Sequence, residues 1–324
     1  MLIVQKFGGS SVADAAKIER VAGIIADTYN AGNEVVVVLS AQGDTTDDLI
    51  DKAHEINPNP SKREMDMLLT VGEQISVSLM AMQLEKMRLP AVSLTGWQIG
   101  MQTNSAYGAA RIKTVATERI RQELDKNRIV IVCGFQGLNK FDDVTTLGRG
   151  GSDTTAVAIA AVLHADKCQI YTDVEGVYTA DPRVVPDARK LREIGYDEML
   201  ELASTGAKVL HNRCVELGRK YKVEIEVLSS MTDAPGTLVR EDSKVEKMLI
   251  SGVAADRNVL LCTIFGMKNE PGQAFRLFQR LGAAGINVDI ILQSVPHDGD
   301  KCMAFTVRKE DEAETRRVID EYAK

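Results

Sequence analysis

The sequence predicts an α/β protein with a largely parallel sheet, followed by a smaller α+β domain. After Glu34, the run as far as Leu39 is continuously apolar and rich in valine, as in strands that are buried on both faces. Strand patterns alternate with helical patterns as far as residue 228, which places helices on both faces of one sheet. After Gly236 the chain becomes charged and loses its periodicity. We therefore expect two domains, residues 1–242 and residues 243–324.

Composition narrows the class of protein further. The 324 residues carry a net charge of −7 and are 44% hydrophobic, as in folded globular proteins. This charge argues against a nucleic-acid partner, because neutralising phosphates requires clustered lysine and arginine. The N-terminus lacks the segments of a signal peptide, and no run approaches a membrane span. We expect a cytoplasmic protein with no membrane partner, whose five widely spaced cysteines are reduced thiols.

In the first domain, apolar runs predict strands and helical periodicities predict helices. Ile18, Val21, Ala22 and Ile25, for example, recur at helical spacing. The predicted strands cover residues 2–5, 34–39, 91–94, 129–133, 167–172 and 224–228. The predicted helices cover residues 18–32, 62–87, 109–126 and 154–164.

The second domain follows a different order of elements. Its pattern predicts a strand at 259–265, a helix at 271–284, strands at 286–293 and 301–308, and a helix from residue 310. This β-α-β-β-α order is one strand short of the ferredoxin-like module. Either the run 248–253 supplies the missing edge, or the sequence stops inside a longer regulatory region.

The first glycine-rich segment is Lys6-Phe-Gly8-Gly9-Ser10-Ser11, which follows the first strand and precedes a helix. Glycines let backbone N–H groups approach an anion, and a helix N-terminus adds partial positive charge. The spacing matches neither the P-loop nor the dinucleotide-binding fingerprint. A tight turn with a serine cap explains the glycines equally well, but the adjacent lysine favours a phosphate site.

A second glycine-rich segment, Gly148-Arg149-Gly150-Gly151-Ser152-Asp153, also begins a helix. Arg149 can bind a carboxylate or a phosphate, and Asp153 can hold Mg²⁺ or a lysine. The simpler alternative is a loop with a helix cap. Two such loops at the carboxyl ends of strands would converge on one crevice, the usual ligand position in open α/β sheets.

The segment from residue 172 to residue 183, TDVEGVYTADPR, follows another predicted strand. It concentrates polar groups, an aromatic ring and an arginine, so it could wrap a nucleotide. A well-capped surface loop is an equally good interpretation, because Asp-Pro and Glu-Gly are ordinary turn sequences. Lys208 is either a phosphate contact or a surface lysine whose stem covers apolar neighbours.

These segments, in this order, resemble the signatures of aspartate kinases within the amino-acid kinase superfamily. The resemblance rests on KFGGSS, GRGGSD, TDVEGVYTADPR and the Lys208-Val-Leu-His211 segment, and it covers residues 1 to about 240. It implies a three-layer αβα fold, with ATP over the C-terminal half of the sheet and aspartate over the N-terminal half. The implied reaction is phosphoryl transfer from Mg-ATP to the side-chain carboxylate of L-aspartate, the first step of lysine, threonine and methionine biosynthesis.

The resemblance also assigns residues, position by position. The residues that the resemblance assigns to catalysis of phosphoryl transfer are Lys6, Gly8, Gly9, Ser10 and Asp153. The aspartate-binding group is Ser40, Thr45, Glu73, Arg149 and Ser152, with Arg149 on the α-carboxylate. The ATP-binding group adds Thr172, Asp173, Tyr178, Asp181, Arg183 and Lys208 to Lys6, Gly8, Gly9 and Ser10. Mg²⁺ is expected on acidic groups or nucleotide oxygens, with no individual ligand assigned.

The C-terminal part resembles an ACT domain, the amino-acid-sensing module of these enzymes. The implied effector residues are Gly272, Gln273, Ala274, Asp289 and Gln293, and lysine and threonine are the candidate effectors. An ordinary helix start after Pro-Gly is the alternative for residues 271–274. Relatives usually carry two ACT units and this sequence shows about one, so we expect weak feedback inhibition. Relatives also associate through both domains, which predicts at least a homodimer.

Two other functions remain open at this point. One is another kinase of the same superfamily, acting on glutamate, acetylglutamate or a nucleoside monophosphate. The other is a non-catalytic amino-acid sensor that keeps the fold as a scaffold. The KFGGSS segment with the ACT-like tail favours aspartate, and the joint presence of Lys6, Glu73, Arg149 and Asp173 favours catalysis.

Overall fold

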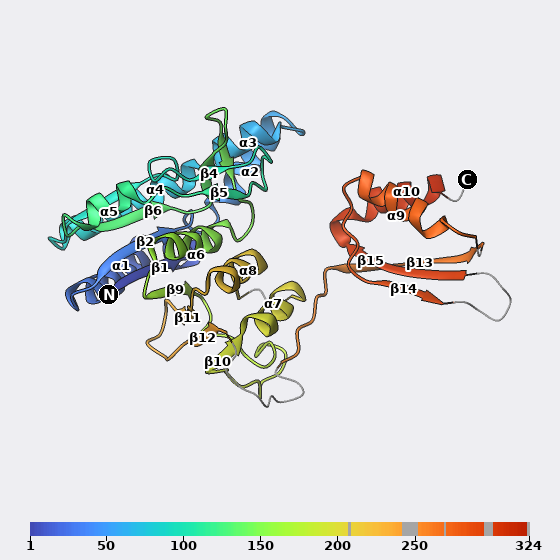
Figure 1. Ribbon diagram of the computed structural model, residues 1–324. Coiled ribbons are helices and arrows are strands. Elements are labelled where there is room, and N and C mark those ends of the chain that lie inside the picture. Colours follow the sequence, from blue (N-terminus) through green and yellow to red (C-terminus); the bar gives the residue numbers. More distant parts are fainter. Residues whose placement is uncertain (207–208, 242–251, 269, 295–300, 323–324) are drawn as a thin grey trace. The chain divides into compact units, whose positions relative to one another are not determined.

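The chain forms two compact units, Met1–Ala254 and Ala255–Lys324. The structure, a computed structural model, describes residues 1–206, 209–241, 252–268, 270–294 and 301–322 (Figure 1). The predicted domain boundary at residues 242–243 lies outside the described residues, as does most of the run 248–253. Each unit has its own hydrophobic core.

An eight-stranded sheet forms the centre of the first unit (Figure 1). Its order is β10-β12-β11-β9-β1-β2-β6-β3. Every described neighbour pair is parallel except β11 with β12, which is antiparallel. The strands are β1 (Leu2–Phe7), β2 (Glu34–Leu39), β3 (Ala91–Leu94), β6 (Ile129–Cys133), β9 (Lys167–Thr172), β10 (Glu193–Gly195), β11 (Ile225–Ser229) and β12 (Thr237–Arg240).

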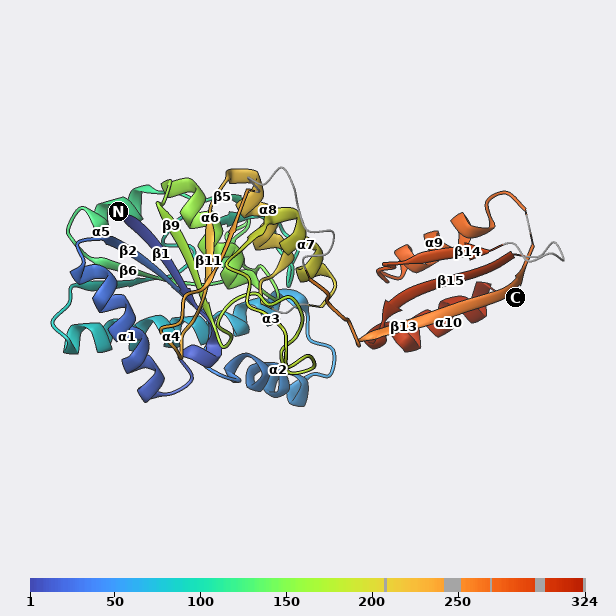
Figure 2. The ribbon, with the colours of Figure 1, turned by 90° about the horizontal axis from the view of Figure 1, so that it is seen from below.

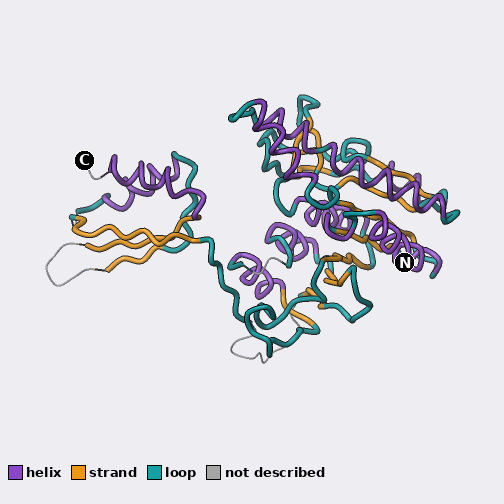
Figure 3. The backbone as a smooth tube through the Cα atoms, turned by 180° about the vertical axis from the view of Figure 1, so that it is seen from behind, coloured by secondary structure: helices purple, strands orange, loops and turns teal. Residues whose placement is uncertain are grey.

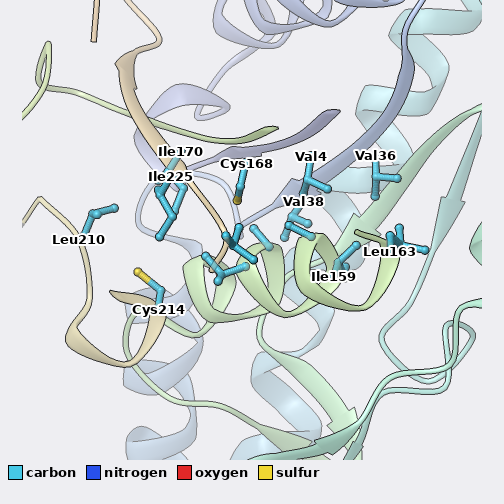
Figure 4. Close-up of a cluster of buried hydrophobic side chains, with 14 of the residues drawn as sticks. Val4, Val36, Val38, Ile159, Leu163, Cys168, Ile170, Leu210, Cys214 and Ile225 are labelled. Atoms are coloured by element: carbon cyan, nitrogen blue, oxygen red, sulfur yellow. The ribbon is translucent and has the colours of Figure 1, made fainter. Parts of the chain in front are cut away.

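Helices cover both faces of this sheet, which confirms the predicted three layers (Figure 2). The core on one face includes α1 (Ala15–Asn30) and α4 (Val71–Lys86), and that on the other includes α5 (Glu118–Leu124), α6 (Gly151–Leu163), α7 (Tyr196–Ser204) and α8 (Asn212–Tyr221). Strand β2 serves both cores because successive side chains point to opposite faces. Val35 and Val37 belong to the first core, and Val36 and Val38 to the second, where Figure 4 shows them near Ile159 of α6.

The register of the central strands brings their carboxyl ends to one edge. Strand β1 lies between β2 and β9, and Phe7 is opposite both Leu39 and Tyr171. Leu39 in turn pairs with Cys133 of β6. The rings of Phe7 and Tyr171 stack with their centroids 4.5 Å apart. The segments that follow these four strands therefore leave the sheet side by side, where open α/β sheets bind ligands.

A second, smaller sheet was not predicted. Its order is β5-β4-β7-β8, and its strands are β4 (Gln102–Thr103), β5 (Ile112–Thr114), β7 (Gln136–Leu138) and β8 (Val144–Thr146). The prediction of one helix over residues 109–126 was wrong in its first half, where β5 lies. Pairing with β4 overrides the local pattern there, because β propensity depends strongly on neighbouring strands.

The predicted helix at 62–87 is divided in two. The helices are α3 (Lys62–Leu69) and α4, and Thr70 lies between them; α2 (Thr45–Ile56) precedes them. By length and composition alone, Lys62–Lys86 could cross a membrane. A core helix passes the same test, and Val77, Met80 and Leu84 of α4 pack into the core beneath the sheet. The segment is therefore weak evidence for a membrane.

The second unit has the predicted β-α-β-β-α order. A three-stranded antiparallel sheet, β13-β15-β14, has both of its helices on one side (Figure 3). The elements are β13 (Val259–Met267), α9 (Gln273–Ala283), β14 (Ile291–Ser294), β15 (Lys301–Arg308) and α10 (Glu312–Tyr322). Leu277, Leu281, Phe305 and Val318 form the core between sheet and helices. All five cysteines of the chain are free thiols, as predicted.

Candidate functional site

A buried ion pair lies where β1 meets α6. Lys6 Nζ is 2.7 Å from Asp153 Oδ1, and each side chain is only about one tenth exposed. Asp153 lies in the first turn of α6, where the helix dipole favours a negative charge. The lysine ammonium also lies beside Gly8, 3.5 Å from where a β-carbon would be. Asp153 thus holds the Lys6 ammonium against the first glycine loop.

The first glycine loop packs closely against the segment that follows β2. A β-carbon on Gly9 would lie 2.5 Å from the carbonyl oxygen of Ala41. The backbone N–H of Gly43 donates to the Gly9 carbonyl at 3.0 Å. Ser40, the first residue after β2, donates its N–H to Phe7 at 3.2 Å. Only glycine fits at position 9, and the contact brings the candidate phosphate loop next to Ser40.

Glu73 supplies a half-satisfied carboxylate from α4. Its side chain is buried, Oε1 accepts a hydrogen bond from Ala41 N at 3.0 Å, and Oε2 has no partner among the described residues. Burial raises the pKa of Glu73 to about 8. Gly72 lets α4 approach, since a β-carbon there would lie 2.7 Å from Ala41 Cβ and 3.5 Å from Thr45 Cγ2. The unpartnered oxygen is suited to a ligand ammonium group.

The second glycine loop exposes one guanidinium. Gly148 and Gly150 both adopt positive φ, 77° and 66°. A side chain at Gly150 would collide with His211, and one at Gly134 would collide with Ser152, so the loop is packed tightly on both sides. Arg149 itself is exposed, and within the described chain its guanidinium has no ion-pair partner. It is free to bind an anionic ligand group.

The segment after β9 leaves the large sheet at the same edge as the two glycine loops. Ser230, which follows β11, donates its N–H to Thr172 at 3.0 Å, and its hydroxyl lies 2.7 Å from that of Ser11. The hydroxyl of Thr172 donates to Asp173, which is exposed. Ser230 therefore links the end of β9 to the first glycine loop.

The remaining predicted nucleotide residues lie farther along this segment. Tyr178 forms an isolated antiparallel bridge with Lys190. Arg183 forms an ion pair with Asp181 at 2.9 Å on the surface. Lys208 lies outside the described residues.

The predicted effector residues divide between two places in the second unit. Gly272, with φ 88°, caps α9, which begins with Gln273 and Ala274. Gln273 is held by Tyr322, whose hydroxyl donates to its Oε1 at 2.9 Å. Gln293 pairs with Met303, close to the end of the sheet from which the chain enters α9. Asp289 precedes β14 and donates its backbone N–H to Thr306, nearer the other end of the sheet.

Two further residues, Asp66 and Arg213, hold the second glycine loop and were not predicted from the sequence. Asp66 accepts hydrogen bonds from Gly108 and Thr146. Arg213 donates to the carbonyls of Leu147 and Ala110 at 2.7 and 2.8 Å. The sequence offers one indication that Asp66 is structurally important, because it is an acidic residue inside the otherwise apolar stretch 65–69. Arg213 gave no signal, because its partners are backbone carbonyls remote in the sequence.

The geometry combines complementary charges at one edge of the sheet. A lysine ammonium and two glycine loops can hold an anion, since loop amides and helix N-termini bind phosphates. A buried carboxylate and a free guanidinium can hold the two charged ends of an amino acid. The site is therefore suited to bringing a phosphorylated ligand and an amino acid together.

Comparison with known proteins agrees with this geometry. Residues 1–229 match the amino acid kinase family, and residues 263–324 match the ACT domain. The aspartokinase of Mycolicibacterium smegmatis is 52% identical over 315 residues, which are 95% of this chain and 75% of that protein.

Two solved structures of E. coli aspartokinase III are also similar. One, in complex with aspartate and ADP, has a TM-score of 0.79 at 30% identity and covers 95% of this chain and 79% of its own. The other, in complex with lysine and aspartate, has a TM-score of 0.78 at 27% identity, and the match covers 99% of this chain and 83% of that one.

The raised pKa of Glu73 predicts a pH-dependent stability. The Glu73 carboxyl group holds its proton more tightly in the folded protein than in the unfolded chain, where its pKa is near 4.5. The stabilisation is complete below that value and is lost as pH rises through about 8. Within this window the free energy of unfolding should fall by up to about 1.4 kcal/mol per pH unit.

Urea unfolding of the ligand-free protein across this pH range tests the prediction. The Glu73→Gln variant should lose this component of the slope, whereas Glu85→Gln, at an exposed position on the same helix, should keep it. Equal slopes for wild type and Glu73→Gln would contradict the assignment.

Proposed function

The chain belongs to the amino acid kinase family, in the group of the aspartokinases, and we propose that it transfers the γ-phosphoryl group of Mg-ATP to the side-chain carboxylate of L-aspartate. The products are 4-phospho-L-aspartate and ADP. The observation that carries the proposal is the Lys6–Asp153 ion pair at the first glycine loop, together with the unpartnered oxygen of Glu73.

We assign the aspartate site to the N-terminal part of the sheet edge. The Glu73 carboxylate receives the substrate ammonium, and the Arg149 guanidinium receives the α-carboxylate. Ser40 and Thr45 lie beside the same strand end, and Ser152 lies in the first turn of α6, three residues after Arg149. The side-chain carboxylate of the substrate then faces Lys6.

The chemistry needs no strong general base, because the attacking carboxylate is already ionised at neutral pH. Phosphoryl transfer depends mainly on positioning and on electrostatic stabilisation. Lys6 and the backbone N–H groups of Gly8, Gly9 and Ser10 offset the repulsion between the anionic substrate and the triphosphate. Asp153 keeps the lysine ammonium in place. The absence of a histidine from the assigned residues is consistent with this mechanism.

ATP is assigned to the edge near β9 and β11. Thr172, Asp173 and Tyr178 surround the nucleotide on one side, with Asp181, Arg183 and Lys208 completing the set. The link from Ser230 to Ser11 supports this assignment, because it places the end of β11 next to the phosphate loop.

Mg²⁺ fits this site as part of the nucleotide complex. Among the described residues, no group of three or more His, Cys, Asp or Glu side chains could hold a metal by itself. Mg²⁺ characteristically keeps water ligands and binds through one or two carboxylates and substrate phosphates. Asp153 and the exposed Asp173 would supply those carboxylates. The ion would neutralise charge on the phosphates.

We also propose that the ACT unit senses an amino acid, with lysine and threonine as candidates. The capped start of α9 at Gly272–Ala274 and the nearby Gln293 supply polar groups at one end of the sheet. Titrating the protein with each amino acid during the kinase assay tests this. No change in rate or in aspartate affinity would contradict it.

The proposed assembly is a homodimer or larger homo-oligomer in the cytoplasm. The ACT sheet has helices on one side only, and Leu261, Phe265 and Leu292 are exposed. Exposed apolar patches of this kind favour association. Sedimentation that shows only monomers at micromolar concentration would contradict the assembly.

The function is tested by incubating the protein with Mg-ATP, aspartate and hydroxylamine. Hydroxylamine displaces phosphate from aspartyl phosphate and gives aspartyl hydroxamate. Phosphorylation of glutamate or of a nucleotide cannot give this product. In this assay Lys6→Ala should lower kcat by about 10²–10⁴-fold, the scale of losing a transition-state charge partner. Lys86→Ala, on the exposed end of α4, is the control. A folded Lys6→Ala variant with normal turnover would refute the assigned role.

Arg149→Lys should raise the KM for aspartate much more than the KM for ATP. Lysine keeps the charge but cannot form a planar bidentate pair with a carboxylate. Steady-state kinetics with each substrate varied measure both values, and Arg119→Lys in α5 serves as the control. Similar increases in both KM values would assign Arg149 to the nucleotide or to the fold.

A further inference from the structure

We propose that Asp66 is a positioning residue for aspartate binding, because it fixes the loop that carries Arg149 relative to the helix that carries Glu73. The inference rests on the proposed function and adds a residue that lies outside the assigned binding groups. Asp66 lies in α3, seven residues before Glu73. It acts through Gly108 and Thr146 rather than through the substrate.

Asp66 is buried and forms no ion pair with any described residue. It is 1% exposed and is the one buried residue of α3. Its carboxylate accepts from the N–H of Gly108 at 2.9 and 3.0 Å. It also accepts from the N–H of Thr146 at 3.0 Å and from the Thr146 hydroxyl at 2.6 Å. A buried carboxylate is costly unless its oxygens are satisfied, and here three donors from two distant segments satisfy them.

These two segments form the base of the second glycine loop. Thr146 ends β8, three residues before Arg149. Ala110 donates its N–H to the Thr146 carbonyl at 2.9 Å. A β-carbon on Gly148 would lie 2.7 Å from the Gly108 carbonyl oxygen. Gly148 therefore rests on the segment that Asp66 ties to Thr146, and a shift of that segment would move Arg149.

The same aspartate is connected to Glu73 through a short, tied junction. Thr70 donates its N–H to the carbonyl of Asp66 at 3.3 Å, and α4 begins at the next residue. Gln136 of β7 donates to the Thr70 carbonyl at 2.7 Å. The helix junction is thus held against β7 while the Asp66 side chain holds β8. Through these bonds the spacing between Glu73 and Arg149 is set.

Arg213 holds the loop from α8, and none of its hydrogen bonds to described residues involves α3 or α4. It donates to the carbonyls of Leu147 and Ala110. These bonds hold the loop of Arg149 but do not connect it to α4. Asp66 alone of the two lies on the chain segment that leads into Glu73. Its loss should therefore affect the substrate that bridges both groups more than the nucleotide.

Asp66→Asn is the direct test, because it keeps the shape and replaces one acceptor oxygen with a donor that faces N–H groups. We expect the KM for aspartate to rise at least about 10-fold, with the KM for ATP changed less than about 2-fold and kcat less than about 5-fold. Glu64→Gln, at an exposed position of the same helix α3, should leave all three values near wild type.

A second pair of variants covers the case in which Asp66→Asn does not fold. Thr146→Val removes the hydroxyl that donates to Asp66, and Thr146→Ser restores it. We expect Thr146→Val to raise the KM for aspartate selectively and Thr146→Ser to restore it. Equal changes in both KM values, or unchanged values in folded Asp66→Asn and Thr146→Val proteins, would overturn the inference. A wild-type protein that forms no aspartyl hydroxamate would instead refute the proposed function.

Discussion

The parallel pairing of β1 between β2 and β9 is the constraint on which the site depends. The register places Phe7 opposite both Leu39 and Tyr171. The loops that follow β1, β2 and β9 therefore leave the sheet side by side. The pairing also explains the valine-rich strands, since a central parallel strand must be apolar on both faces. A shift of one residue would turn each side chain of β1 to the other face. The fold and the position of Lys6 therefore have a common cause.

Close backbone contacts then determine how the loops converge. Gly9 lies against Ala41, Gly134 against Ser152, and Gly150 against His211. At each position a β-carbon would overlap its neighbour. Glycine is needed here for space as much as for conformation, since Gly9 and Gly134 do not adopt positive φ. These contacts bring polar backbone groups close enough to surround a small charged ligand.

Two buried acids of neighbouring helices differ in how their oxygens are satisfied. Asp66 accepts hydrogen bonds at both oxygens, all from the protein. Glu73 has one oxygen bonded to Ala41 N and one without a described partner. For both, burial raises the pKa. The satisfied acid is suited to holding the fold, and the half-satisfied acid is suited to receiving a ligand, because an unpaired buried polar atom is costly until it is bound.

The sequence by itself determined six strands of the large sheet, the order of elements in the second unit and the residue types at the glycine loops. Local patterns suffice there, because burial on both faces, helical periodicity and glycine positions are recorded within short segments. It did not determine the small sheet, where pairing with β4 turned part of a predicted helix into β5. Nor did it reveal Asp66 or Ser230, whose partners lie 42 to 219 residues away. Tertiary structure alone decided these contacts, because a buried hydrogen bond depends on which backbone groups the fold brings together.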